Sequence, residues 1–160
     1  MLKWTGMILI AACAVFAALK TADNGKKRLE IYEALISYIT ELRDGITRLR
    51  LPLGELYMRC SSDVLTSPGF TSMLERFGWA DALKLSGIAE MLDERSFAAL
   101  CELGAVIGKS DAAEQENACN YCISRLQTSF SEIRTDAPKK TRMTSSLCLL
   151  GGVAIIIILL

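Results

Sequence analysis

Cysteine is the residue type in this sequence that most directly suggests chemistry. Six cysteines are present, and Cys119 and Cys122 have the CxxC spacing found in redox centres and zinc sites. There is no second CxxC and no histidine, so a tetrahedral zinc site would need Cys60 and Cys101 to converge on this pair. We therefore interpret the pair as reduced, buried thiols, and we expect neither a metal nor a cofactor.

The sequence does not contain the residue patterns of the common types of catalytic site. The absence of histidine removes the commonest general base and the usual partner of a nucleophilic serine or cysteine. Glu114 with Glu116, and Asp93 with Glu94, are too close in sequence to point the same way on a helix. Neither a GxxxxGKS/T phosphate loop nor a GxGxxG turn is present. We expect a protein that is not an enzyme.

The composition excludes other classes of protein and favours helices. The 160 residues include 18 Lys and Arg and 18 Asp and Glu, so a strongly basic protein that binds nucleic acid is disfavoured. Hydrophobic residues make up 51% of the chain but aromatic residues only 7%, which indicates helices rather than strands. No stretch alternates polar and apolar residues for long enough to predict a strand. The predicted fold class is all-α.

Two uncharged apolar segments flank the rest of the sequence, over 5–19 and 143–160. A helix over 143–160 would be about 27 Å long, close to the roughly 30 Å of a bilayer's hydrocarbon core. The segment 5–19 spans about 22 Å and needs Trp4 and the neighbouring lysines at its ends. We predict an N-terminal transmembrane helix within 1–19 and a C-terminal one over 143–160.

The positive charges beside these segments predict the orientation in the membrane. Basic residues gather on the sides of the two segments that face the middle of the sequence. The positive-inside rule then places residues 20–142 in the cytoplasm and the protein in the cell membrane. The membrane-flanking basic residues are Lys20, Lys26, Lys27, Arg28, Lys139, Lys140 and Arg142.

The first apolar segment also fits a bacterial lipoprotein signal. Lys3, a short apolar run and the Ile-Ala-Ala-Cys sequence that ends at Cys13 resemble such a signal. Residues 14–19, however, remain apolar where a lipoprotein usually becomes polar, and the basic cluster would have to cross the membrane. An uncleaved anchor is therefore the preferred interpretation.

A long amphipathic helix is predicted over 26–49, directly after the first apolar segment. Pro52 is expected at the first position of a short helix that runs through Leu56 and Tyr57. The long helix carries two adjacent apolar lines, which consist of Leu29, Tyr32, Ile36 and Ile39, and of Ile31, Leu35, Tyr38, Leu42, Ile46 and Leu49.

Shorter elements follow in the middle of the sequence. Residues typical of turns occupy 61–63 and 67–69. Short helices are predicted over 70–77 and 79–85, with Trp79 as a core anchor rather than a binding hot spot.

The clearest local signal is a helical hairpin near Gly108. A helix opened by Asp93 or Ser96 ends at Gly108, and Asp111 at once offers an N-cap for the next helix. That last helix is predicted to run past Ile133, with Pro138 as a kink or a single weak point. Its apolar line consists of Tyr121 or Cys122, then Leu126, Phe130 and Ile133.

Several short motifs occur in a characteristic order. The sequence LPLGEL over 51–56 follows the long helix, WADAL over 79–83 comes next, and GKSD over 108–111 precedes Gln115. Together with the flanking apolar segments, they resemble the stage III sporulation protein AB family of endospore-forming bacteria over essentially the full chain. The most specific piece is Gly-x-Ser-Asp-x-x-x-Gln. The chain departs from the family at Gly54, where members commonly have a second proline.

The resemblance implies a role in the multiprotein apparatus that joins mother cell and forespore during engulfment. The protein would lie on the mother-cell side of the engulfing membrane. Such proteins look like the inner-membrane platform protein of type II secretion and type IV pilus systems, whose cytoplasmic domains are six-helix bundles. The expected partners are a secretion-type ATPase, the AA protein of the same operon, and other channel components. Candidates for partner contact are Pro52, Gly108, Ser110, Asp111 and Gln115.

We therefore predict a non-enzymatic scaffold with two membrane spans and a cytoplasmic bundle of about six helices that docks the ATPase. The bilayer is a further partner, nucleic acid is not, and a homo-oligomer is possible. One alternative is a purely structural protein that oligomerises in the membrane, with Gly151 and Gly152 aiding close helix approach. Another is an extracytoplasmic lipoprotein or redox protein that uses Cys119 and Cys122.

Overall fold

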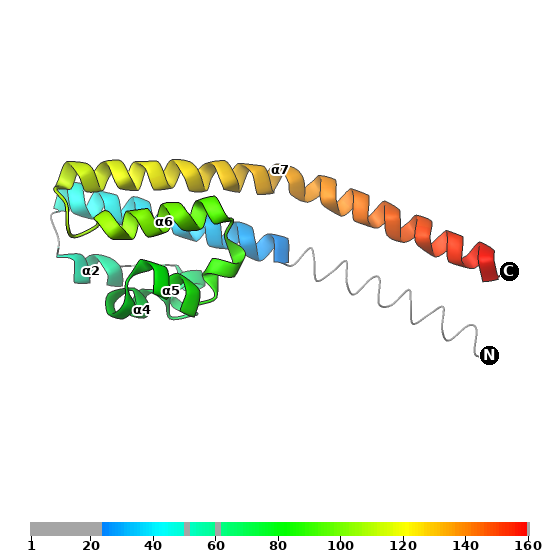
Figure 1. The fold of residues 1–160 in the computed structure, drawn as a ribbon, viewed down its shortest axis with the longest axis horizontal. Helices are drawn as coiled ribbons and strands as arrows, with labels where there is room; N and C mark the ends of the chain where they lie inside the picture. Colours follow the sequence, from blue (N-terminus) through cyan, green and yellow to red (C-terminus); the bar gives the residue numbers. More distant parts are fainter. Residues whose placement is uncertain (1–23, 50–51, 60–61, 160) are drawn as a thin grey trace. The chain divides into compact units, whose positions relative to one another are not determined.

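A computed structural model describes the backbone of residues 24–49, 52–59 and 62–159, and side chains as far as Thr135. Over these ranges the chain forms seven α-helices and no strand, which confirms the predicted all-α class (Figure 1). The chain divides into two compact units, one of residues 28–131 and one of residues 1–27 with 132–160.

The elements follow one another with short connections. The first helix covers residues 24–44 and continues into a π-helical turn, η1 (Gly45–Leu49). The remaining elements are α2 (Leu53–Met58), α3 (Asp63–Thr66), α4 (Phe70–Phe77), α5 (Trp79–Leu85), the 3-10 helix η2 (Ile88–Met91), α6 (Glu94–Val106) and α7 (Ala112–Leu159).

Most predicted helix boundaries are confirmed, because caps and glycines set them locally. Helices α4 and α5 have the predicted bounds, separated by Gly78 at a φ of 79°. Asp93, rather than Ser96, is the N-cap of α6, since its side chain accepts a hydrogen bond from the Ser96 backbone N–H. Helix α7 continues through position 138 as one helix.

The predicted end of the long helix and the predicted turn at Asp63 are wrong. The long helix is α-helical only to residue 44, and the π-helical turn that follows leaves Leu49 56% exposed instead of in the core. In this turn Gly45 lies so close to Leu56 of α2 that a Cβ atom would collide with the leucine side chain. Asp63, expected in a turn, instead begins the single-turn helix α3 after Ser62.

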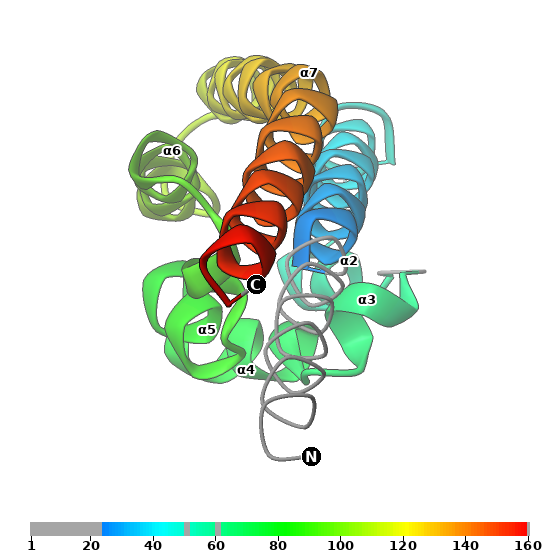
Figure 2. The same ribbon diagram turned by 90° about the vertical axis from the view of Figure 1, so that its right-hand side faces the viewer.

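The core of the unit 28–131 is formed by the first helix, α6 and the first half of α7 together with the short helices α2 to α5. The first helix and the first half of α7 lie side by side (Figure 2). Arg43 Nη1 donates to Asn120 Oδ1 at 2.9 Å and joins the two helices. The short helices pack among themselves, α4 against α5 and α2, and α5 also against α6. Burying each large aliphatic side chain contributes about 1.5–3 kcal/mol. Fully buried residues include Tyr32, Leu35, Ile39, Leu42, Phe70, Leu83, Leu100 and Leu126.

The predicted membrane segments are only partly covered by the structure. Residues 1–19 lie outside the described residues, and for 143–160 the structure describes helical backbone to Leu159 without side chains. Among the described residues, no helix combines the length and the apolar character that crossing a bilayer requires.

Candidate functional site

The turn between α6 and α7 has the capping geometry that the sequence predicts. Gly108 adopts a φ of 77°, and the backbone N–H groups of Lys109 and Ser110 both donate to the Val106 carbonyl, at 3.1 and 3.3 Å. The Asp111 carboxylate accepts a hydrogen bond from the Glu114 N–H at 2.7 Å. Two helices therefore reverse direction within a few residues, and each end is capped.

Gln115 holds the same turn from the other side. Its amide Oε1 accepts from the Gly108 N–H at 3.3 Å, and its Nε2 donates to the Ser110 carbonyl at 2.6 Å. The sequence indicated Gln115 only as part of a motif, although an amide one turn into α7 can reach back to unpaired groups of the turn. The motif residues thus stabilise the turn, and the turn fixes the position of α6 relative to α7.

Replacing Asp111 with alanine should destabilise the unit by about 1 kcal/mol, since one N-cap hydrogen bond is lost. Chemical denaturation of the full chain, followed by circular dichroism, measures this loss. Asp111→Asn is the matched control, because it keeps a capping oxygen and should cost a few tenths of a kcal/mol at most. A variant that keeps its stability but loses partner binding would show that Asp111 makes a contact instead.

Pro52 lies close to this turn through its neighbour in sequence. It is exposed and occupies the N-cap position of α2, one residue before the helical position predicted for it. Leu53 packs against Gly108, where a Cβ atom would lie 2.5 Å from the leucine Cδ1. The structure therefore brings the start of α2 and the α6–α7 turn together at one end of the unit.

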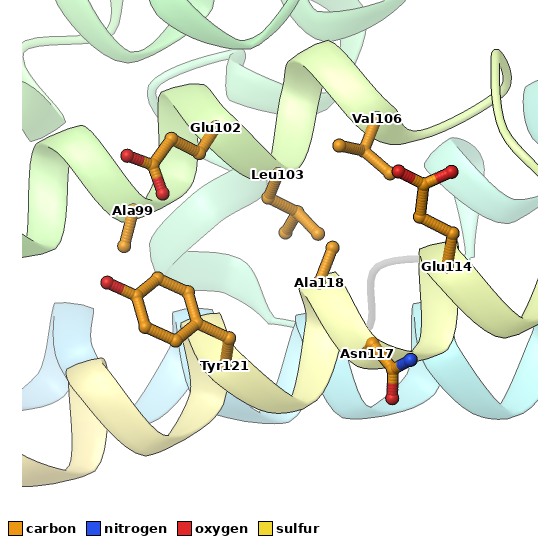
Figure 3. Close-up of a pocket in the computed structure, with 8 residues that line it drawn as sticks. All are labelled: Ala99, Glu102, Leu103, Val106, Glu114, Asn117, Ala118 and Tyr121. Carbon is orange, nitrogen blue, oxygen red and sulfur yellow. The ribbon is translucent and has the colours of Figure 1, made fainter.

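A groove of about 310 Å³ begins at the turn and runs between α6 and α7. Leu103 is fully buried, whereas Tyr121 is 53% exposed. Glu102 and Glu114 lie towards opposite ends of the groove, with Leu103 and Ala118 between them (Figure 3). The lining consists of Ala99, Glu102, Leu103 and Val106 from α6 and of Glu114, Asn117, Ala118 and Tyr121 from α7. We name these eight residues the α6–α7 groove.

A buried polar network ties the first helix to α6 and α7. The Tyr32 hydroxyl donates to Asp93 Oδ1 at 2.8 Å and accepts from the Asp93 N–H at 3.0 Å. Ser129 Oγ lies 3.1 Å from Asp93 Oδ2 and 3.0 Å from Ser96 Oγ. Tyr32 and Ser96 are fully buried. The sequence predicted Asp93 or Ser96 as the cap, but not these partners.

The electrostatics of the network favour an ionised Asp93. Burial acts to raise the pKa of its carboxyl, but hydrogen bonds from Ser96, Tyr32 and Ser129 outweigh burial and leave the pKa below its ordinary value. Burial likewise raises the pKa of Tyr32, so the hydroxyl stays protonated and can donate. The network has the properties of a structural tie rather than of an acid–base catalyst.

Comparison with known proteins gives the family. Residues 3–160 match the family described as stage III sporulation protein AB, and this match covers nearly the whole chain. The chain belongs to the stage III sporulation protein AB family. No curated protein and no solved structure matches it. The family predicted from the motifs is thereby confirmed, and with it a role in sporulation.

The CxxC pair of this family member is part of the core. Cys119 and Cys122 are free and fully buried, and burial raises their pKa values to about 11 and about 12. Thiols with such values stay protonated at neutral pH and are poor nucleophiles and ligands. In the part of the chain that the structure describes, no group of three or more cysteine, aspartate or glutamate side chains is placed to hold a metal. Cys101 is half-buried, and Cys60 lies outside the described residues.

The membrane-flanking basic residues are only partly described. Lys26 and Lys27 are exposed, whereas Arg28 is half-buried and its Nε donates to the Met91 carbonyl at 2.8 Å. Arg28 thus fastens the first helix to the end of η2. Lys20 and the side chains of Lys139, Lys140 and Arg142 lie outside the described residues.

Proposed function

We propose that this protein is a non-enzymatic scaffold in the membrane apparatus between mother cell and forespore, and that its helical bundle docks a secretion-type ATPase. The observation that carries the proposal is the family match over residues 3–160, which gives a role in sporulation. The ATPase is the AA protein that the family resemblance implies.

The surface of the unit 28–131 suits protein binding. The α6–α7 groove is open and mainly apolar, and its charged residues lie at its ends instead of converging on one point. A pocket for a small substrate usually has polar groups that converge on the ligand, whereas a groove of this kind fits the apolar face of a helix. The capped α6–α7 turn keeps the two walls in register.

The scaffold is proposed to lie in the cell membrane with helices within 1–19 and over 143–160 as anchors. Residues 20–142 would then face the cytoplasm of the mother cell, where an ATPase can reach them. The basic residues next to both apolar segments support this orientation, because positive charge is retained on the cytoplasmic side.

The proposal is tested by titrating the purified AA-type ATPase onto the full chain in lipid nanodiscs and measuring the affinity by calorimetry. We expect saturable binding with a Kd of about 1 μM or tighter, which is a binding free energy of about −8 kcal/mol or stronger. Nanodiscs with lipid alone are the control. A homo-oligomer that shows no affinity for the ATPase would contradict docking and favour a purely structural role.

A further inference from the structure

The α6–α7 groove is hollow because small side chains stand where the two helices meet. Ala99 on α6 and Ala118 on α7 line it, and neither fills the space beside Leu103. Val106 and Tyr121 contribute further apolar surface, and Tyr121 is among the large hydrophobic residues of the described unit that remain mostly exposed. An apolar face of this kind gains free energy when a second apolar surface covers it.

The charge of the groove has one sign. Glu102 and Glu114 are its ionisable acidic residues, they come from different helices, and none of the lining residues is basic. Figure 3 shows the two carboxylates towards opposite ends of the lining, with Leu103 and Ala118 between them. A ligand in the groove would therefore meet negative charge at both ends and apolar surface in the middle.

The negative ends and the apolar middle of the α6–α7 groove favour some ligands over others. An anionic ligand or an acidic helix would be repelled by Glu102 and Glu114. Besides these two carboxylates, the side chains of the lining offer a small polar molecule only the Asn117 amide and the Tyr121 hydroxyl. An amphipathic helix that places small apolar residues on one face, with Lys or Arg on both sides of them, matches both properties.

We propose that the α6–α7 groove is the docking site for a basic amphipathic helix of the partner ATPase. The inference rests on the proposed function and adds the site and the chemistry of the segment that binds there. The apolar face of that helix covers Leu103 and Ala118, and its basic residues pair with Glu102 and Glu114. The Gly108–Asp111 turn and Gln115 act as positioning residues, since they fix the spacing of the two walls.

The experiment measures ATPase affinity for the full chain in nanodiscs with the double variant Glu102→Lys/Glu114→Lys. Reversing both charges should weaken binding about 100-fold, because two attractions become two repulsions. The matched control is Glu33→Lys/Glu75→Lys, which makes the same change of net charge at two exposed positions outside the groove, and it should change the affinity by less than about threefold.

A second variant tests the groove without changing its charge. Ala118→Trp fills the space beside Leu103 and should abolish binding, while circular dichroism shows whether the helices remain intact. If wild type binds but the Glu102→Lys/Glu114→Lys and Ala118→Trp variants bind equally well, the groove is not the site, although docking itself stands. If wild type does not bind, both proposals fail. A groove variant that instead changes the oligomeric state, seen by light scattering, would identify a second copy as the occupant and overturn the ATPase assignment.

Discussion

Replacing Trp79 with alanine is expected to lower the free energy of unfolding by about 3–5 kcal/mol, the cost of removing a large aromatic side chain from a core. Trp79 is 5% exposed at the start of α5. Its ring centroid lies 6.2 Å from that of Tyr38, 6.0 Å from Phe70 and 6.5 Å from Tyr57. These contacts join α5 to the first helix, α4 and α2, so removing the Trp79 ring would weaken the packing of four helices.

The close packing of Trp79 against α6 should increase the stability that Trp79→Ala loses. A Cβ atom at Gly104 would lie 2.5 Å from the Trp79 Cβ and 2.6 Å from its Cγ, so the two backbones approach closely only because position 104 has no side chain. The cavity left by Trp79→Ala therefore has a rigid wall and cannot easily collapse.

Chemical denaturation followed by circular dichroism measures the loss for Trp79→Ala. Phe77→Ala is the matched control, because this phenylalanine is nearby in sequence but 56% exposed, and its removal should change stability by less than about 0.5 kcal/mol. Equal effects of the two substitutions would contradict the role of Trp79 as a core anchor.

Local signals explain how much of this fold could be predicted from the sequence. Gly78 and Gly108 adopt positive φ angles and end helices, and Asp93 and Asp111 cap the next ones, so each boundary follows from a few adjacent residues. The π-helical turn at Gly45 could not be predicted in this way, because it accompanies a contact with Leu56, which belongs to another helix.

Spatial pairing explains what the sequence could not predict. Tyr121 and Cys122 both fit the helical period of α7, and only the packing shows that Cys122 is buried and Tyr121 exposed. Tyr32 and Asp93 are 61 residues apart, so periodicity carries no information on their hydrogen bond. The groove likewise becomes visible only when Ala118 is seen on α7 beside α6.

Asp93→Ala is expected to lower the free energy of unfolding by about 2–4 kcal/mol, the sum of a lost N-cap and of lost hydrogen bonds in the buried network. The Ser96 N–H and the Tyr32 hydroxyl would both lose the Asp93 oxygen that they now bond, and both residues are fully buried. Asp111→Ala serves as the matched control, because the same residue type caps α7 at an exposed site, where its side chain accepts from the Glu114 N–H, and should cost only about 1 kcal/mol. Equal losses for the two variants would show that the network adds nothing to the cap.

The Asp93 carboxylate should make the free energy of unfolding depend on pH. Because the pKa of Asp93 is lower in the folded protein than its ordinary value of 3.8, the unfolded state binds the proton more readily. The contribution of the charge is therefore fully present above that ordinary value, and it is lost as the pH falls through the folded pKa. Asp93→Asn keeps an oxygen at the cap but cannot titrate, so the stabilities of wild type and variant from denaturation curves, which differ by a constant amount near pH 7, should begin to approach each other as the pH falls below about 4. A constant difference between the two proteins from about pH 7 down to about pH 3 would mean that Tyr32 and Ser129 do not hold Asp93 in its ionised form, and that the first helix, α6 and α7 are joined by neutral hydrogen bonds instead.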